Sequence, residues 1–413
     1  MRKKLALSLT ALLVVLIGLG GGAVLKLRER PHAGLDTAVT GVSVATGSAR
    51  PVSPRPRAAS AEVCWLSFGG GPQRTLSRPE FKLGRPVDPV WATRMHDLME
   101  FPPVYCDGRL YVNLEHGTTV AVDAANGRVR WAWHTSGGAP SSPAVAGPRL
   151  IVASKGGTVT ALDRANGHVL WQLRTSTAFE SSPIVVAGTI YVGAHDGRLF
   201  AIALRTGKVR WAFATGGRIN GSPSVFGDRI FIANYAGSVF GLRLSDGHEL
   251  WRTDLSRDLV RYESFYASPS TDGRRVFVAA RSGKLAALSV AAGKTIWTRH
   301  IGTLLYATPA VANGRVFVGG FDGVLHAFRT DTGNELWTRR VGGRILAPAL
   351  VVGDLVFFST LEGQTYAARV TDGRLVWTHQ GGQYAPGIAT DRHYYFSLNG
   401  LLVAYRGASA PNS

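Results

Sequence analysis

The chain has 413 residues, of which 45% are hydrophobic and 18% are charged, and its formal net charge at pH 7 is +19. This composition is ordinary for a globular protein with a large buried core. The two cysteines exclude a disulfide-dense scaffold and a zinc cluster built on cysteine.

Positive charge is spread over the whole chain. Residues 1–62 contribute +6 and the remainder contributes +13. A positive field favours anionic partners such as lipid headgroups, acidic polymers or acidic proteins. No basic run is interleaved with aromatic residues, so no nucleic-acid partner is expected.

Residues 1–30 predict a membrane anchor. After the basic start MRKK, an uncharged run extends from Leu5 to Leu25, which is 21 residues and about the length that a helix needs to cross a hydrocarbon core. A cleaved signal peptide stays open as the alternative, although no clean cleavage site follows the run. The first interpretation gives a single-pass protein with its N-terminus inside, and the second gives a secreted protein. Both place the rest of the chain outside the cytoplasm.

The chain between the anchor and the repeats divides into two parts. Residues 31–62 are rich in Pro, Ala, Ser and Gly without apolar periodicity, which predicts a flexible linker. Residues 63–85, called here the leading segment, contain the stretch WLSFGGGPQRTLSRP. Residues 86–407 are periodic, and residues 408–413 are expected to be a disordered tail.

Tryptophan marks the period of residues 86–407. Eight tryptophans recur at intervals of 40 residues, with one interval of 46: Trp91, Trp131, Trp171, Trp211, Trp251, Trp297, Trp337 and Trp377. A period of this length indicates repeated supersecondary units rather than a conventional domain. We predict that each indole ring fills the space between neighbouring units.

Each unit has the same internal order. A proline precedes an apolar stretch, a β-rich run such as RLIVAS follows, and two glycine turns separate an alternating run from the tryptophan strand. This order predicts four short antiparallel strands and no helix after the anchor. Stacking such sheets radially and closing the ring buries both apolar faces of each sheet. The sequence therefore predicts an all-β, eight-bladed β-propeller of four-stranded antiparallel blades.

The two ends of the repeat predict how the ring closes. Eight prolines mark eight inner strands: Pro103, Pro143, Pro183, Pro223, Pro269, Pro309, Pro348 and Pro386. The last unit stops before its tryptophan strand, whereas the strand around Trp91 has no unit ahead of it. We predict that this N-terminal strand closes the last blade. A seven-bladed ring is the alternative, and it would leave one repeat unit outside the ring.

The repeat resembles a known motif. The pattern A-x-D-x-x-x-G-[KR]-x-x-W, complete in Ala121, Asp123, Gly127, Arg128 and Trp131, resembles the tryptophan-docking motif of the PQQ-like, or quinoprotein-like, eight-bladed propellers. The leading segment is also similar to the segment that precedes such propellers. The second unit keeps Ala161, Asp163, Gly167 and Trp171, and the later complete units keep the glycine and the tryptophan but lose the aspartate. The resemblance covers residues 63–407 and implies the fold more than a function.

Two branches of that family differ in function. Quinoprotein dehydrogenases use a ring-bound quinone, Ca²⁺, an aspartate base and often a pair of adjacent cysteines, which this sequence lacks. The BamB-like branch is non-catalytic and binds partner proteins through its loops, and the uniform repeats resemble that branch more. The resemblance thus implies a non-catalytic scaffold of the cell envelope, with no cofactor, no metal and no required oligomer. A PQQ-dependent oxidoreductase, or a small-ligand sensor that uses the mouth of the axial channel, is the alternative.

Two groups of residues are candidates for partner or ligand binding. Residues three positions ahead of the marker prolines should lie at one mouth of the axial channel: Glu100, Glu180, Asn220, Tyr266, Tyr306 and Gln383. The longer tryptophan interval adds six residues to the connection before Tyr266, which also carries Arg257, Asp258, Arg261 and Tyr262. Arginine and tyrosine are favoured anchors of protein interfaces. Single histidines such as His195 are expected to be surface or turn residues.

Cys64 and Cys106 are candidates for a disulfide. Export places both thiols in an oxidising compartment, where disulfides form and persist. A bond between them would pin the leading segment to the first repeat unit. Two buried thiols are the alternative.

Overall fold

The computed structural model describes residues 64–255, 264–384, 387–398 and 400–409. The predicted anchor, the predicted linker and the candidates Arg257, Asp258, Arg261 and Tyr262 lie outside the described residues. Within the described residues, no helical segment has the length and hydropathy of a membrane span. Those residues form strands and turns only, as the sequence predicts for the repeats.

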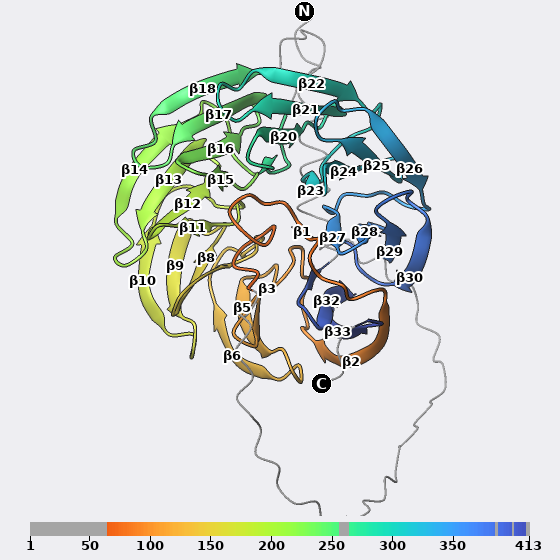
Figure 1. Ribbon diagram of the computed structural model, residues 1–413. Coiled ribbons are helices and arrows are strands. Elements are labelled where there is room, and N and C mark those ends of the chain that lie inside the picture. The colour runs from red at the N-terminus through yellow and green to blue at the C-terminus, as the bar shows by residue number, and fades with distance from the viewer. Residues whose placement is uncertain (1–63, 256–263, 385–386, 399, 410–413) are drawn as a thin grey trace, which may run out of the picture. The chain divides into compact units, whose positions relative to one another are not determined.

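Eight sheets follow one another around a common axis, so the prediction of an eight-bladed propeller is confirmed (Figure 1). Blade 1 comprises β3 (Val104–Cys106), β4 (Arg109–Asn113), β5 (Thr118–Asp123) and β6 (Val129–His134). Blade 2 comprises β7 (Ala144–Ala146), β8 (Arg149–Ala153), β9 (Thr158–Asp163) and β10 (Val169–Arg174). Blade 3 comprises β11 (Ile184–Val186), β12 (Thr189–Gly193), β13 (Arg198–Ala203) and β14 (Val209–Ala214). Blade 4 comprises β15 (Ser224–Phe226), β16 (Arg229–Ala233), β17 (Ser238–Arg243) and β18 (Glu249–Asp254).

The second half of the ring repeats this order up to its last blade. Blade 5 comprises β19 (Ser270–Thr271), β20 (Arg275–Ala279), β21 (Lys284–Ser289) and β22 (Thr295–His300). Blade 6 comprises β23 (Ala310–Ala312), β24 (Arg315–Gly319), β25 (Val324–Arg329) and β26 (Glu335–Arg340). Blade 7 comprises β27 (Leu350–Val352), β28 (Leu355–Thr360), β29 (Gln364–Arg369) and β30 (Leu375–Gln380). Blade 8 comprises β31 (Ile388–Ala389), β32 (His393–Leu398), β33 (Leu401–Gly407) and the early strand β2 (Pro86–Arg94).

Burial explains the residue pattern of each blade. The second and third strands are buried along almost their whole length, as in β4 and β5, because a neighbouring sheet covers each face. These strands are therefore apolar on both faces. The outer strand alternates between exposed and half-buried residues, as in β6, because only one edge of it is paired.

The early strand closes the ring as predicted. β2 pairs antiparallel with β33, and Trp91 lies opposite Ala404 in that pairing. The last sheet therefore contains residues from both ends of the propeller. Blade 7 departs from the four-stranded prediction, because β1 (Ser77–Arg78), which the sequence did not predict, pairs parallel with β27 as a fifth strand.

The tryptophans lie between the blades. The indole Nε1 of Trp131 donates to Arg164 O at 3.1 Å, in the turn between the third and fourth strands of the next blade. The same contact recurs for six other tryptophans: Trp91, Trp171, Trp211, Trp251, Trp297 and Trp337. Blade 8 has no such turn, since its outer strand comes from the start of the chain. Trp377 packs there on Phe396 and Tyr405, with ring centroids 5.8 and 6.3 Å apart.

Candidate functional site

Each inner strand begins at the same end of its blade, and we call that end of the ring the mouth. The connections that lead into β3, β11, β15, β19 and β23 carry the predicted residues Glu100, Glu180, Asn220, Tyr266 and Tyr306. Gln383 lies in the corresponding connection ahead of β31 and is partly buried. The turn between the second and third strands of each blade lies at the same end. The second strand runs antiparallel to the inner strand, so it ends where the inner strand begins.

These turns are tied to the connections by main-chain hydrogen bonds. The N–H of His195 donates to Ala178 O at 3.0 Å, and the N–H of Tyr235 donates to Arg218 O at 2.9 Å. The same bond recurs at Glu115, Lys155, Arg281, Phe321 and Leu361. All seven residues hold the same position in the repeat, so they form a second circle of side chains beside the predicted one.

A charged cluster surrounds Glu180 at the mouth. Its carboxylate lies 3.3 Å from Lys155 Nζ, 3.2 Å from His195 Nε2 and 3.1 Å from Arg218 Nη2. The Asn220 amide donates to the same carboxylate, and Arg218 Nε donates to Asn220 Oδ1 at 2.7 Å. The fold thus brings Glu180 and Asn220 together, as their repeat positions predict. His195 lies in the turn between β12 and β13, as the sequence predicts, and also belongs to this cluster, which the sequence did not predict.

The two predicted glutamates of the mouth differ in their pKa values. Burial acts to raise the pKa of Glu180, but the hydrogen bond and charge of His195, with those of Lys155 and Arg218, outweigh burial and lower this pKa to about 2. Burial, followed by the negative charge of Glu115, raises the pKa of Glu100 to about 7. Glu180 is therefore an anion at neutral pH, whereas Glu100 titrates there.

An arc of aromatic side chains continues from the charged cluster. Tyr235 and Tyr266 have ring centroids 6.4 Å apart, Tyr266 and Tyr306 are 5.9 Å apart, and Tyr306 and Phe321 are 6.3 Å apart. Burial raises the pKa of Tyr235 to about 12 and raises the pKa of Tyr266 as well. The phenol groups of this arc therefore stay neutral.

Arginines cover the arc of aromatic rings. The guanidinium of Arg218 lies 5.7 Å from the centroid of Tyr235, and that of Arg344 lies 5.3 Å from the centroid of Phe321. Arg281 Nε donates to the Tyr306 hydroxyl at 3.1 Å. Stacked arginine and tyrosine side chains present a large, partly apolar surface with hydrogen-bond donors, which suits a protein contact.

One group at the mouth has ligand atoms close enough to consider a metal ion. Oxygen or nitrogen atoms of Asp97, Glu115 and His116 lie within 4.8 Å of one another. His116 Nδ1 already pairs with Asp97 Oδ1 at 2.8 Å. Three side-chain ligands are fewer than the complete set that structural Zn²⁺ or Ca²⁺ takes.

The leading segment fills the axis of the propeller (Figure 1). Its carbonyl oxygens accept hydrogen bonds from inner strands, and Leu66 O, Pro72 O and Thr75 O accept from blades 2, 4 and 6. The segment also bonds to blade 5 through Gln73 O and to blade 7 through Leu76 O. The main chain of Trp65 pairs with that of Tyr105 in blade 1, and its indole donates to Ala389 O in blade 8.

Arg74 supplies the contact to the remaining blade. Its guanidinium is fully buried and donates to Ser182 O of blade 3 at 2.9 Å, to Phe68 O at 2.7 Å and to Pro223 O. Burial lowers the pKa of Arg74 to about 9. The leading segment therefore bonds to all eight blades, and a side chain of this segment occupies the interior where the inner strands converge.

A belt of hydroxyl groups joins the inner strands around this segment. The residue before the marker proline is Ser142, Ser182, Ser222, Ser268 or Thr308 in blades 2 to 6. Each hydroxyl after the first accepts the N–H of the matching residue one blade earlier, at 2.8 to 3.1 Å. The Ser142 hydroxyl donates to Pro102 O of blade 1 at 2.7 Å. The repeated Ser-Pro and Thr-Pro pairs were the sequence signal for this belt.

Cys64 and Cys106 form a disulfide in the structure, with their Cα atoms 4.5 Å apart. The bond joins the start of the described chain to the end of β3. It lies beside Trp65, whose main chain pairs with Tyr105 on the same strand.

A family model described as outer membrane protein assembly factor BamB matches residues 87–237, 211–305 and 281–407. These overlapping ranges run without a gap from β2 to the last residue of β33. A sequence search among curated proteins finds no match.

Similar solved structures include BamB and two dehydrogenases. BamB from Moraxella catarrhalis is 15% identical with a TM-score of 0.67, and the match covers 78% of this chain and 99% of that one. Quinohemoprotein alcohol dehydrogenase from Comamonas testosteroni is 13% identical with a TM-score of 0.70, covering 85% and 82%. A europium-containing methanol dehydrogenase is 12% identical with a TM-score of 0.70, covering 81% and 87%. At these identities the likeness shows the fold alone.

Proposed function

Because the chain belongs to the family described as outer membrane protein assembly factor BamB, we propose that it is a non-catalytic scaffold that binds partner proteins of the cell envelope. In this proposal the uncharged run Leu5–Leu25 is a retained anchor with its N-terminus inside. The propeller then lies outside the cytoplasm, and residues 31–62 hold it away from the membrane. The partner carries an anionic surface that complements the basic propeller.

The observation that carries this proposal is the filled axis. The leading segment bonds to all eight blades, and its buried side chains Phe68 and Arg74 occupy the space that a deeply bound ligand would need. What remains available at the mouth is a rim of arginines and aromatic rings. Such a surface favours contact with another protein over enclosure of a small molecule.

The residues present do not fit the quinone cofactor of the related dehydrogenases. A quinone bound within the ring would need space that Phe68 and Arg74 fill, and both side chains are buried. The two cysteines of the chain are 42 residues apart and bonded to each other, so they are not the adjacent pair of such enzymes. We derive no reaction step through a quinone.

The partner contact is proposed to centre on the arginine and aromatic rim of blades 5 to 7. Tyr306, Phe321 and Arg344 face the mouth there, and Arg344 Nε is held by Glu362 Oε1 at 2.7 Å. Arg257, Asp258, Arg261 and Tyr262 stay in the proposal, because they belong to the connection that leads to Tyr266.

Crosslinking in intact membranes followed by affinity capture tests this proposal. The wild-type chain should capture a defined envelope protein, and the double variant Tyr306→Ala with Arg344→Ala should capture about tenfold less, as loss of two interface anchors predicts. Val129→Ala with Val169→Ala is the matched control, since these side chains are 50% and 49% exposed on outer strands. Equal capture by the rim variant and the wild type would contradict the proposal.

A second measurement addresses the oxidoreductase alternative. The protein is incubated with PQQ and Ca²⁺, and bound cofactor and alcohol-dependent dye reduction are measured. We expect neither stoichiometric uptake nor turnover. Turnover that depends on the added cofactor would replace the scaffold proposal with an enzymatic one.

A further inference from the structure

A second surface feature lies at the end of the blades opposite the mouth. It is a groove of about 480 Å³ between blades 5 and 6. Its walls are the turn between β19 and β20, the turn between β23 and β24, and the turn between β25 and β26. Four arginines and two aspartates line it: Arg274, Arg275, Arg315, Arg329, Asp272 and Asp331.

The wall from blade 5 is a rigid turn. Asp272 Oδ1 accepts the N–H of Arg274 at 2.9 Å and the N–H of Arg275 at 2.7 Å, and Asp272 Oδ2 accepts from Arg275 Nη1 at 2.6 Å. Thr271 Oγ1 also accepts the N–H of Gly273 at 3.0 Å. The Arg274 side chain therefore extends from a fixed main chain.

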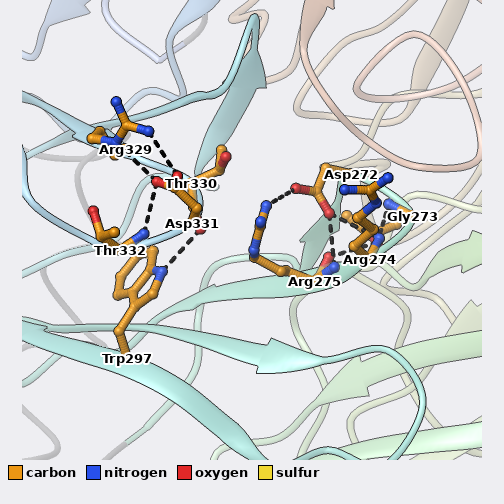
Figure 2. Close-up of polar contacts among 10 residues, drawn as sticks. Asp272, Gly273, Arg274, Arg275, Trp297, Arg329, Thr330, Asp331 and Thr332 are labelled. Atoms are coloured by element: carbon orange, nitrogen blue, oxygen red, sulfur yellow. Dashed lines mark hydrogen bonds and ion pairs between the residues drawn. The ribbon is translucent and has the colours of Figure 1, made fainter.

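The opposite wall is held in a similar way. Arg329 pairs with Asp331 through two bonds, at 3.0 and 2.7 Å, and Thr330 O accepts from Trp297 Nε1 at 2.9 Å. Figure 2 shows the two turns facing each other, and among the residues drawn no marked interaction joins one turn to the other.

Two other blade junctions are bridged at this level, and a smaller groove of about 310 Å³ lies at the first of them. Between blades 1 and 2, Arg109 Nη1 donates to Ala165 O at 3.3 Å, and Arg164 pairs with Asp107. Between blades 4 and 5, Arg229 Nη1 donates to Ala291 O at 2.7 Å. Arg275 holds the position of Arg109 and Arg229 in blade 5, but its pairing with Asp272 keeps it on its own turn. Within the parts of the chain that the structure describes, Arg275 therefore makes no bond to blade 6, and the two blades are joined from β22 instead, where Trp297 Nε1 donates to Thr330 O and Arg299 Nε donates to Gly333 O at 2.7 Å.

The arginines that line the groove outnumber the aspartates that line it. Arg275 and Arg329 are paired with Asp272 and Asp331. Among the described residues, Arg274 and Arg315 form no ion pair, so the four arginines and two aspartates of the lining leave a net charge of +2. Arg315 Nη1 donates only to Asn313 O, at 3.2 Å, and its Nε is buried without a hydrogen-bond partner.

We infer that this groove binds a small anion with about two negative charges, of phosphate or dicarboxylate chemistry. Guanidinium groups match both anions through paired N–H donors. Arg274 and Arg315 supply the uncompensated charge: Arg274 extends from the fixed main chain of the β19–β20 turn, and Arg315 is the first residue of β24. This site is separate from the mouth, so it does not depend on the proposed scaffold function.

Calorimetric titration of the full chain in detergent tests the inference, with inorganic phosphate and succinate as separate probes at neutral pH and low ionic strength. The wild type should bind at least one probe saturably. Arg274→Gln with Arg315→Gln should weaken binding about tenfold or more, the loss expected for charge-assisted contacts. Arg274→Gln alone, at an exposed side chain, should weaken it less and keeps the test valid if the double variant is unstable.

The junction between blades 1 and 2 offers the matched control. Arg109→Gln with Arg164→Gln removes the same charge from the equivalent place and should leave binding unchanged. Binding of phosphate alone, or of succinate alone, supports the inference and identifies the chemistry. Absence of saturable binding with both probes, or an equal loss in the control variant, would overturn it.

Discussion

Glycine residues determine where the tryptophans can lie. In the sequence, Gly167 and Trp171 belong to one repeat, but Gly167 contacts the indole ring of Trp131, from the blade before. A Cβ atom added at Gly167 would lie 2.6 Å from Trp131 Cε3. The motif therefore describes a contact between successive blades. Each repeat supplies its glycine to the junction with the blade before it and its tryptophan to the junction with the blade after it.

A glycine substitution should separate this contact from main-chain strain. Gly207 has a φ of 71°, and a Cβ there would lie 2.5 Å from Trp171 Cε3, whereas Gly188 has a φ of 72° and open space around it. Gly188→Ala should cost about 1 kcal/mol through its left-handed main chain alone. Gly207→Ala should cost a further ~1–3 kcal/mol by overpacking. Urea unfolding measures both, and equal losses would show that the indole contact does not constrain the glycine.

The Glu100 carboxyl group should make stability depend on pH. Its folded-state pKa, about 7, is raised above the ordinary 4.5, so the folded state binds more protons than the unfolded state between these values. The contribution of Glu100 therefore falls as pH rises through this window, by up to about 3 kcal/mol. Glu100→Gln should gain stability relative to the wild type between about pH 5 and about pH 8, measured by urea unfolding at both.

Asp331→Asn is the control for this measurement, because Asp331 is not among the charges that act on Glu100. The hydrogen bond from Arg329 lowers the pKa of Asp331 to about 2, so its contribution is fully present above about pH 4 and is lost only in more acidic solution. The difference between Asp331→Asn and the wild type should be the same at both pH values. A Glu100→Gln difference that also stayed constant would show that this carboxyl group does not titrate near neutral pH.

Among the elements, the leading segment has the widest set of partners. It has no period of its own, and most of its bonds go from its carbonyl oxygens to main-chain N–H groups of inner strands. Main-chain hydrogen bonds of this kind do not require particular side chains in the strands. The sequence therefore did not predict that the leading segment lies on the axis. The fully buried Arg74 was the visible signal, as a charged residue within an apolar and glycine-rich stretch.

Reduction of the disulfide should loosen this element first. The Cys64–Cys106 bond closes a separation of 42 residues, and the loop-closure entropy of a loop of this size corresponds to about 4 kcal/mol. Cys64→Ser with Cys106→Ser should lower the unfolding free energy by up to that amount. Unfolding of the wild type with and without reductant measures the same quantity, and identical curves would contradict it.

At the scale of the whole molecule, the fold could be predicted because the repeat is long and regular. Eight tryptophans at nearly constant spacing gave the number of blades, and an incomplete unit at each end predicted the pairing of β2 with β33. The mouth could be predicted only in part. The spacing from the marker prolines predicts the places of Glu180 and Asn220. Lys155, His195 and Tyr235 hold an equally regular position, but it lies beyond the second strand and is not marked by a proline.

The groove between blades 5 and 6 could not be predicted from the repeat. Arg275 occupies the same repeat position as Arg109 and Arg229, and the sequence alone does not show which partner each guanidinium takes. The choice depends on Asp272, which accepts two main-chain N–H groups and holds Arg275 on its own turn. One aspartate thus changes the bond that this guanidinium makes, from the next blade to its own turn.

Pairing of β2 with β33 has a consequence for biosynthesis. A ribosome releases Pro86–Arg94 long before Leu401–Gly407, and at 5–20 residues per second the delay is roughly 15–60 s. Throughout that delay β2 has no strand to pair with. The unfinished ring also exposes the face or edge of a sheet at each end to other nascent chains. The ring therefore closes only after Leu401–Gly407 has been made, and chaperones that shield sheet edges should matter most during that interval.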